Sequence, residues 1–198
     1  MPGSPPLVAR GPFGTLPDGT RVDQFVLSNA NDVSLAVIEY GATVVSLCVP
    51  DRHGVFDDVV LGHEGLAGYL RTDSPYLGGV VGRYANRIAL GRFRLDGRQY
   101  QLATNDGRHH LPGGLAGLDR RLWTAEPFHG PEGPAVRFSR VSPAGEEGYP
   151  GALTVSVTYA LTAANAVVVE YVAATDAPTV VNLTQHSYFN LAGLRAGD

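Results

Sequence analysis

The sequence predicts an all-β protein built as a large, twisted antiparallel β-sandwich. Twenty-five glycines and 14 prolines interrupt the 198 residues at short intervals, and the runs between them are rich in Val, Thr, Tyr and Phe. This composition is typical of many short strands. Helical periodicity is scarcely visible beyond a possible turn at residues 66–70. Because amphipathic strands bury one face against another sheet, and no repeat or linker divides the chain, we expect one sandwich domain over residues 1–198.

The clearest strand covers residues 151–162. Along it, apolar side chains alternate with Thr and Ser, and the apolar set is Leu153, Val155, Val157, Tyr159 and Leu161. Successive side chains of a strand point to opposite faces, so this alternation predicts one buried and one solvated face.

A β-hairpin is predicted at residues 92–102, because Asp96-Gly97 is a two-residue turn signal between two short strand patterns. Further strands are predicted at residues 22–27, 33–49 with a break at Gly41, 57–61, 135–141, 166–173 and 179–191.

Composition excludes several classes of chemistry. Every one of the 15 basic residues is Arg, so a Schiff-base lysine, a pyridoxal phosphate anchor and a P-loop lysine are all absent from this sequence. Cys48 is the single cysteine, so no internal disulfide or thiolate metal cluster can form. The net charge is −4 and the arginines are scattered along the sequence, so we expect no nucleic-acid partner.

The first residues lack a basic and apolar leader pattern, and no stretch reaches 18 uninterrupted apolar residues. We therefore expect a cytoplasmic protein with no membrane partner. The oligomeric state cannot be predicted from this pattern.

Neither a G-x-S-x-G elbow nor an H-E-x-x-H motif is present. The residues that could carry chemistry lie in three polar clusters instead, at residues 82–88, 108–114 and 182–190.

The third cluster, taken as a strand, places its polar side chains on one face: Asn182, Thr184, His186, Tyr188 and Asn190. A face of hydrogen-bonding groups with one imidazole suits a polyhydroxylated ligand, and imidazole exchanges protons near neutral pH. An ordinary solvated face with a surface histidine explains the pattern equally well.

In the first cluster, Asn86 and Arg87 offer an amide and a guanidinium that can grip vicinal hydroxyls. By spacing alone, surface charges are the better interpretation of Arg83 and Arg87. His109 and His110 read as a polar loop entering a Gly-Gly turn, and adjacent histidines without a spaced carboxylate do not indicate a metal site.

The three clusters, in this order, resemble the aldose 1-epimerase (galactose mutarotase) family. Matching segments run through most of the chain, at residues 40–43, 59–62, 81–89, 145–151 and 182–191. The resemblance implies a large β-sandwich that binds an aldohexose such as glucose or galactose. It also implies interconversion of the α and β anomers by acid/base ring opening and reclosure, without a cofactor.

By the same resemblance, Asn86 and Arg87 correspond to the sugar-binding pair. His186 corresponds to the catalytic histidine that protonates the ring oxygen. Cleavage of the bond between C1 and the ring oxygen also requires removal of the proton from the C1 hydroxyl.

Two features depart from the family. Its Leu-His-Gly-Gly motif is Leu111-Pro-Gly-Gly114 here, so Pro112 replaces a second active-site histidine. His110 is a candidate to substitute for it in catalysis, since it lies two residues earlier. The family also continues well beyond this length and supplies its general base, a glutamate, from the later part. Glu146 and Glu147 stay unassigned, because their Gly-Glu-Glu-Gly context matches a family segment without base duty.

A sandwich interrupted in its middle leaves unpaired strand edges and exposed apolar faces. We therefore expect the domain to be incomplete at its C-terminus, and the chain alone to be poorly soluble or poorly folded. Two alternatives to an epimerase remain open. One is a non-catalytic carbohydrate-binding homologue, which Pro112 favours. The other is a polysaccharide hydrolase or lyase, which needs a carboxylate pair that the spacing does not reveal.

Overall fold

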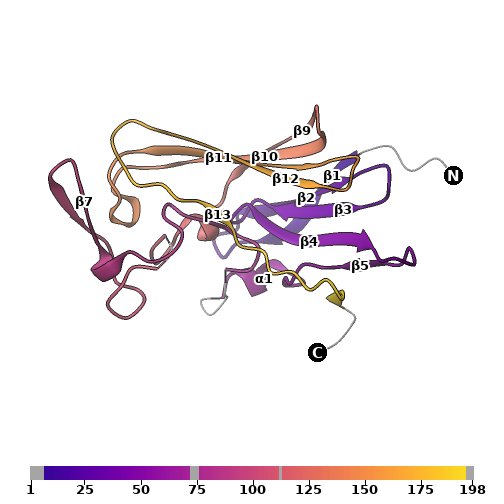
Figure 1. Ribbon diagram of the computed structural model, residues 1–198, viewed down its shortest axis with the longest axis horizontal. Coiled ribbons are helices and arrows are strands. Elements are labelled where there is room, and N and C mark those ends of the chain that lie inside the picture. Colours follow the sequence, from indigo (N-terminus) through magenta and orange to yellow (C-terminus); the bar gives the residue numbers. More distant parts are fainter. Residues whose placement is uncertain (1–6, 72–75, 112, 195–198) are drawn as a thin grey trace.

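The computed structural model describes residues 7–71, 76–111 and 113–194. Its body consists of two antiparallel sheets stacked face to face (Figure 1). One sheet has the order β1-β2-β3-β4-β5, and the other has the order β12-β11-β10-β9. The all-β sandwich predicted from the sequence is confirmed.

The strands of the first sheet follow one another along the chain, and each pairs with the next: β1 (Leu7–Thr15), β2 (Arg21–Ser28), β3 (Ser34–Ile38), β4 (Thr43–Pro50) and β5 (Phe56–Asp58). The second sheet is a meander formed by β9 (Thr124–Gly130), β10 (Gly133–Ser142), β11 (Leu153–Leu161) and β12 (Val167–Thr175). Because every connection within a sheet is short, both sheets form from local pairings.

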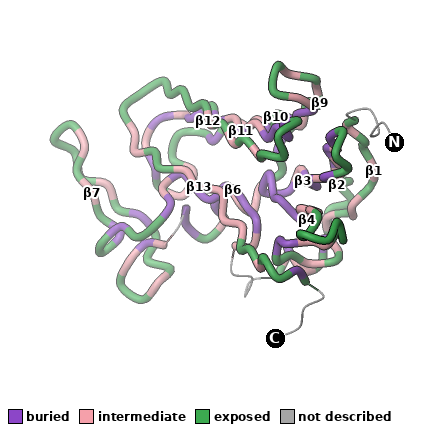
Figure 2. Tube along the Cα trace, turned by 45° about the vertical axis from the view of Figure 1, so that its right-hand side comes forward, coloured by how far each residue is buried: buried purple, intermediate pink, exposed green. Residues whose placement is uncertain are grey.

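The hydrophobic core lies between the two sheets, where Figure 2 shows the buried segments. The predicted alternation of β11 is confirmed, since Leu153, Val155, Val157, Tyr159 and Leu161 are each 0% exposed. From the opposite sheet, the ring of Phe25 packs edge-on against Phe138 with centroids 5.9 Å apart. Burial of such side chains contributes about 1.5–3 kcal/mol each to folding.

The remaining elements are short. They are α1 (Leu66–Tyr69), β6 (Val80–Val81), β7 (Arg92–Leu95), β8 (Arg98–Gln101) and β13 (Thr184–Gln185), with 3₁₀ turns at Ala89–Gly91, Leu118–Arg120 and Glu146–Gly148. β13 pairs with β6 and so brings residues 184–185 beside residues 80–81.

The hairpin of β7 and β8 projects from one end of the sandwich (Figure 1). Asp96 and Gly97 have φ values of 49° and 76°. Positive φ at both central positions is what a two-residue hairpin turn requires, so the Asp-Gly signal is confirmed. The helical turn expected at residues 66–70 is present as α1.

The strand expected at residues 179–191 is much shorter than predicted. Only Thr184–Gln185 is regular strand, and isolated bridges occur at Asn182 and Phe189. The segment changes partner along its length: His186 N–H donates to the Gly79 carbonyl, whereas Asn190 N–H donates to the Val59 carbonyl. A chain that passes from one short partner to another cannot build a long ladder.

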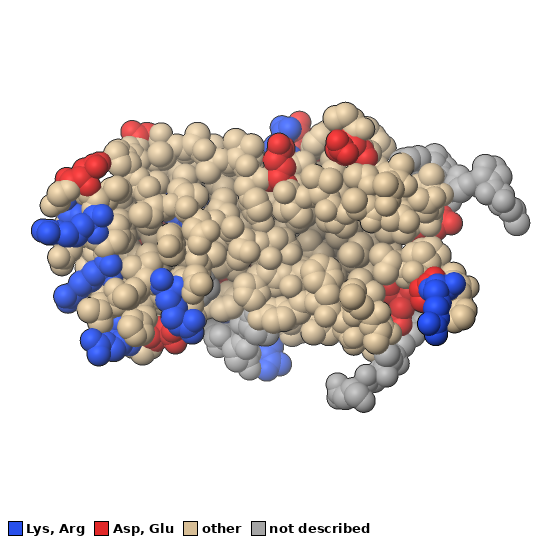
Figure 3. Space-filling view, viewed as in Figure 1, with Lys and Arg blue, Asp and Glu red and all other residues tan. Residues whose placement is uncertain are grey.

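Charged side chains are sparse over much of the face in Figure 3, and the arginines seen there gather mainly at the end that carries β7. Across the described part of the chain, none of the helices has both the length and the apolar character needed to cross a bilayer.

Candidate functional site

A pocket of about 680 Å³ opens beside β6 and β13. Both the first and the third polar clusters reach it. Its walls are formed by Tyr76, Val81, Ala85, Asn86, Arg87, Leu111, Asn182, Leu183, Thr184, His186 and Tyr188. The volume is that of an ordinary small-molecule site, and the lining mixes apolar side chains with a few convergent polar groups.

His186 is held by its backbone on β13's side of the pocket. Its N–H donates to the Gly79 carbonyl, and its own carbonyl accepts from Gly78 N–H, both over 3.0 Å. Two tyrosines flank the imidazole, with ring centroids 5.9 Å away for Tyr76 and 5.0 Å away for Tyr188. Within the described residues, no side chain or backbone group hydrogen-bonds the ring nitrogens. The imidazole is therefore positioned among aromatic rings with its nitrogens available to a ligand.

Asn86 and Arg87 lie on another wall of the same pocket. Asn86 has a φ of 87°, a conformation that Asn tolerates better than most residues, and its Oδ1 accepts from Arg87 N–H over 2.8 Å. The Arg87 guanidinium pairs with Asp106, with Nε 2.7 Å from Oδ2. Arg87 is thus a surface charge, as spacing suggested, but one with a fixed orientation beside the pocket.

Asn182 joins these two walls. Its side-chain amide donates to the Ala85 carbonyl over 2.8 Å, and its backbone carbonyl accepts from Ala85 N–H over 2.7 Å. Its own N–H donates to the Arg83 carbonyl over 2.9 Å. Residues almost a hundred positions apart in sequence therefore converge on one pocket.

The structure does not bring His110 to this pocket. Its side chain is 0% exposed and lies 2.8 Å from the Ala103 carbonyl through Nδ1 and 2.7 Å from the Tyr149 hydroxyl through Nε2. A carbonyl can only accept, so Nδ1 carries a proton, and in the neutral imidazole Nε2 accepts from Tyr149. Both ring nitrogens are occupied inside the protein, and this geometry gives no support to a catalytic role. Pro112 lies outside the described residues.

Arg83 is buried, at 2% exposure, so its interpretation as a surface charge was wrong. Its guanidinium donates five hydrogen bonds to the segment of residues 142–151. The acceptors are the hydroxyl of Ser142 and the carbonyls of Ser142, Pro143, Pro150 and Gly151. No spacing rule marks such a residue, because its acceptors come from a loop about 60 residues away.

The carboxylates of the two adjacent glutamates, Glu146 and Glu147, also accept hydrogen bonds within the protein. Glu146 accepts from the Ser142 hydroxyl and from Arg140, whose Nη2 is 3.0 Å away. Burial acts to raise the pKa of Glu146, but these two hydrogen bonds and the charges of Arg140 and Arg121 together outweigh it and hold the pKa below its usual value. Glu147 accepts from backbone N–H groups of Leu115 and Ala116. Neither carboxylate is among the residues that form the pocket walls.

A second, much smaller cavity of about 20 Å³ lies behind Tyr76. Asp119 borders it with a side chain only 7% exposed, and its Oδ1 has no hydrogen-bond partner among the described residues. Burial raises the pKa of Asp119 to about 6, against which the neighbouring Arg120 acts. Among the residues that the structure describes, no cluster of His, Cys, Asp and Glu has the arrangement of a metal site.

Sequence reasoning missed five of the apolar and aromatic pocket residues, Tyr76, Val81, Ala85, Leu111 and Leu183. Tyr76 and Leu111 lie in irregular segments, where no periodicity tells which way a side chain points.

The family model described as Aldose 1-epimerase matches residues 23–197 of the chain. The galactose mutarotase of Bos taurus is 50% identical over 187 residues, which cover 94% of this chain and 53% of that protein. The galactose mutarotase of Homo sapiens is 48% identical over 187 residues, with the same coverage of 94% and 53%. The aldose 1-epimerase of Escherichia coli (strain K12) is 35% identical over 177 residues, 89% of this chain and 50% of that protein.

Solved structures agree with this match. A galactose 1-epimerase from Lactobacillus acidophilus NCFM superposes with a TM-score of 0.83 at 28% identity, over 94% of this chain and 54% of that one. A GalM/aldose epimerase homologue from C. elegans gives 0.77 at 33% identity, over 92% and 51%. The chain spans about half the length of the relatives it matches.

Proposed function

Because the chain belongs to the aldose 1-epimerase family, we propose that its pocket binds an aldohexose and takes part in interconversion of the α and β anomers. One observation carries this proposal: His186, Asn86 and Arg87 line the same pocket although they come from separate parts of the sequence. The site is wide enough for a hexose, and its polar groups suit hydroxyls.

In this proposal, His186 is the acid that delivers a proton to the ring oxygen. Protonation weakens the bond between C1 and that oxygen, and the ring opens when the C1 hydroxyl loses its proton. Rotation about the C1–C2 bond of the free aldehyde then exposes its other face, and reclosure gives the other anomer. A positioned acid contributes about 10²- to 10⁴-fold to such a step. Only protons are moved, so the reaction needs no cofactor.

Asn86 and Arg87 are proposed to grip the sugar hydroxyls. A guanidinium offers donors in a fixed fork, and an amide offers both a donor and an acceptor. The ion pair with Asp106 limits the orientations open to Arg87 and so reduces the entropy that binding would otherwise cost.

The pocket favours a second candidate function, a carbohydrate-binding protein with little or no catalysis. Within the described part of the chain, the residues that line the pocket include one imidazole and no carboxylate. A proton can therefore be donated at His186, but no lining carboxylate is placed to take the proton from the C1 hydroxyl.

Polarimetry on freshly dissolved α-galactose or α-glucose tests the proposal. We expect the chain to speed the approach to anomeric equilibrium, and the His186→Gln variant to fall back to the spontaneous rate. His129→Gln is the matched control, because His129 is an exposed residue of β9 in the far sheet. Binding of galactose without acceleration by the parent chain supports the binding function instead. An acceleration that His186→Gln leaves intact refutes the assigned role of His186.

We further propose that the protein acts in the cytoplasm and needs no nucleic-acid partner. A single cysteine supports the first point, because disulfides are typical of exported proteins. The net charge of −4 supports the second.

A further inference from the structure

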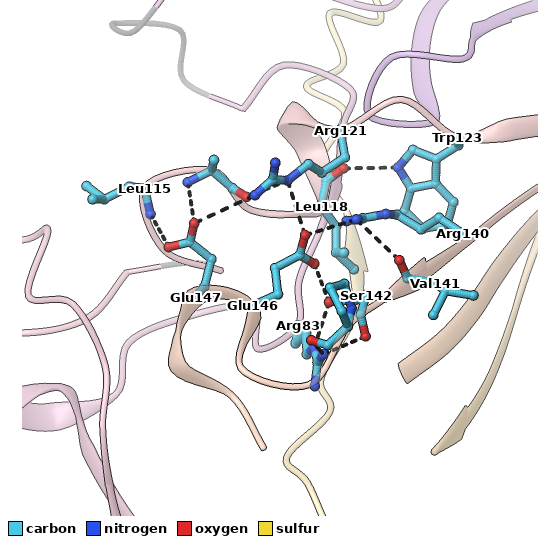
Figure 4. A network of polar contacts seen from close by, with 12 residues as sticks. Arg83, Leu115, Leu118, Arg121, Trp123, Arg140, Val141, Ser142, Glu146 and Glu147 are labelled. Carbon is cyan, nitrogen blue, oxygen red and sulfur yellow. Dashed lines mark hydrogen bonds and ion pairs between the residues drawn. The ribbon is translucent and has the colours of Figure 1, made fainter. Parts of the chain in front are cut away.

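The loop between β10 and β11, residues 143–152, contacts two of the segments that contribute to the pocket walls (Figure 4). On one side its carbonyls accept the guanidinium hydrogen bonds of Arg83, three residues before Asn86. On the other side its Glu147 accepts hydrogen bonds from Leu115 and Ala116, which follow Leu111. The loop is therefore a common support for two walls of the pocket.

The backbone conformation of Glu147 is unusual, and it directs the side chain toward residues 114–116, which follow Leu111. Its φ is 51°, in the left-handed region that non-glycine residues seldom adopt. The side chain is 16% exposed, and its carboxylate lies against residues 114–116. A backbone of this kind persists only where surrounding contacts stabilise it.

The carboxylate uses both oxygens on this wall. Oε2 accepts from Leu115 N–H over 2.9 Å, and Oε1 accepts from Ala116 N–H over 3.2 Å. Arg121 adds a cation, with Nη2 3.9 Å from Oε1. Gly114 is part of the fit, since a Cβ there would collide with Glu147 Oε2 and its φ is 102°. Hydrogen bonds to an ionised acceptor are about twice as strong as neutral ones.

Asn105 holds the same segment at its other end. Its Oδ1 accepts from Leu111 N–H over 2.9 Å, and its Nδ2 donates to the Leu111 carbonyl over 2.7 Å and to the Gly114 carbonyl over 3.1 Å. Leu111 itself lines the pocket. The Asn105 amide thus holds Leu111 and Gly114, and the Glu147 carboxylate holds Leu115 and Ala116.

We propose that Glu147 is a positioning residue: by holding the N–H groups of Leu115 and Ala116, its carboxylate fixes the Leu111 wall and so sets the affinity of the pocket for sugar. This inference rests on the proposed function, because it takes the pocket to be the sugar site. It assigns to Glu147 a role distinct from that of a general base, since both carboxylate oxygens are directed at backbone N–H groups.

The test compares Glu147→Ala and Glu147→Gln with the control Glu126→Gln, an exposed glutamate of β9. Two quantities are measured by NMR on the whole chain: amide hydrogen exchange, and the dissociation constant for galactose. In Glu147→Ala we expect exchange at Leu115 and Ala116 to speed up about tenfold or more, and galactose to bind about tenfold more weakly. For Glu147→Gln we expect exchange rates and a galactose dissociation constant between those of the parent and Glu147→Ala, because its amide keeps only one acceptor oxygen. The control changes neither quantity.

Core amides in β11 report whether a variant is merely destabilised. If amide exchange at Val155 and Val157 also rises in Glu147→Ala, that variant is destabilised as a whole. The positioning role is then judged from the isosteric Glu147→Gln variant. Faster exchange at Leu115 and Ala116 with unchanged galactose affinity overturns the positioning role, and so does unchanged exchange. If the parent chain binds no galactose and leaves anomerisation at its spontaneous rate, the proposed function fails. In that case the exchange data test only whether Glu147 holds the N–H groups of Leu115 and Ala116. The proposal that Glu147 sets sugar affinity is then refuted together with the proposed function.

Discussion

Replacing Arg83 by Met should cost about 4 kcal/mol of folding free energy, because it removes a buried donor group and leaves its acceptors in place. Of the five hydrogen bonds, three are buried: those to the Ser142 hydroxyl, the Ser142 carbonyl and the Gly151 carbonyl. Those to Pro143 and Pro150 are only partly buried, so their carbonyls can regain water. The Ser142 hydroxyl keeps Glu146 as a partner.

Two buried carbonyls without partners cost about 1–3 kcal/mol each, which sets the magnitude. Met fills a similar volume, so cavity formation adds little. Burial lowers the pKa of Arg83, with Glu146 acting in the opposite direction. Because the arginine stays charged, the loss includes charge-assisted bonds.

Urea unfolding followed by Trp123 fluorescence measures this change. Trp123 is the single tryptophan and is 2% exposed, so its emission reports loss of the core. The exposed Arg94 of β7 is the matched control, and Arg94→Met should stay within about 0.5 kcal/mol of the parent. Arg83→Lys keeps the positive charge but loses the planar set of guanidinium donors. It should therefore recover only part of the stability that Arg83→Met loses. An Arg83→Met variant as stable as the parent, or a fully restored Arg83→Lys, refutes the reasoning.

Three further predictions concern acids and the sandwich surface. The pKa of Asp119 is raised in the folded state from 3.8 to about 6, so its ionisation destabilises the fold by about 2.5 kcal/mol as pH rises from 4 to 7; Asp119→Asn should remove that part of the pH dependence in urea titrations, and an unchanged profile contradicts it. Asp106→Asn should weaken galactose binding about two- to fivefold in an NMR titration with little effect on stability, because the ion pair with Arg87 is exposed; equal affinity argues against orientation by Asp106. Val172 of β12 is 57% exposed, and Val172→Lys should raise the concentration at which turbidity appears; unchanged turbidity excludes this edge as the source of association.

The central strands could be predicted because burial imposes a pattern on them. The edge strands β5 and β12 were also predicted, whereas the edge strands β1 and β9 were not. β11 has partners on both sides and one face in the core, so its residues alternate. β1 and β9 are edge strands with mostly exposed side chains, and neither was predicted. β1 also contains an irregular register between Pro12 and Gly14, and Pro127 interrupts the strand pattern of β9. With little burial, such strands carry no periodic signal.

Some residues in and around the pocket could likewise be identified from the sequence, and others could not. His186, Asn86 and Arg87 lie in polar clusters that the sequence makes conspicuous, but the resemblance to the epimerase family, and not spacing, selected them as site residues. The direction of His110 could not be predicted, because it depends on backbone bonds to Ile88 that pair two distant segments. The burial of Arg83 depends on carbonyls contributed by another loop, and hydrogen bonds between a side chain and a remote backbone leave no trace in spacing.

The carboxylates around the pocket explain why binding and catalysis must be tested separately. Asp106 pairs with Arg87, Glu146 with Ser142 and Arg140, and Glu147 with backbone N–H groups. Each is engaged by these partners, and none of the three is among the residues that line the pocket. The described walls can therefore orient a sugar and donate one proton from His186. Removal of the second proton depends on another acceptor or on solvent, so the measured acceleration reports the acid contribution on its own.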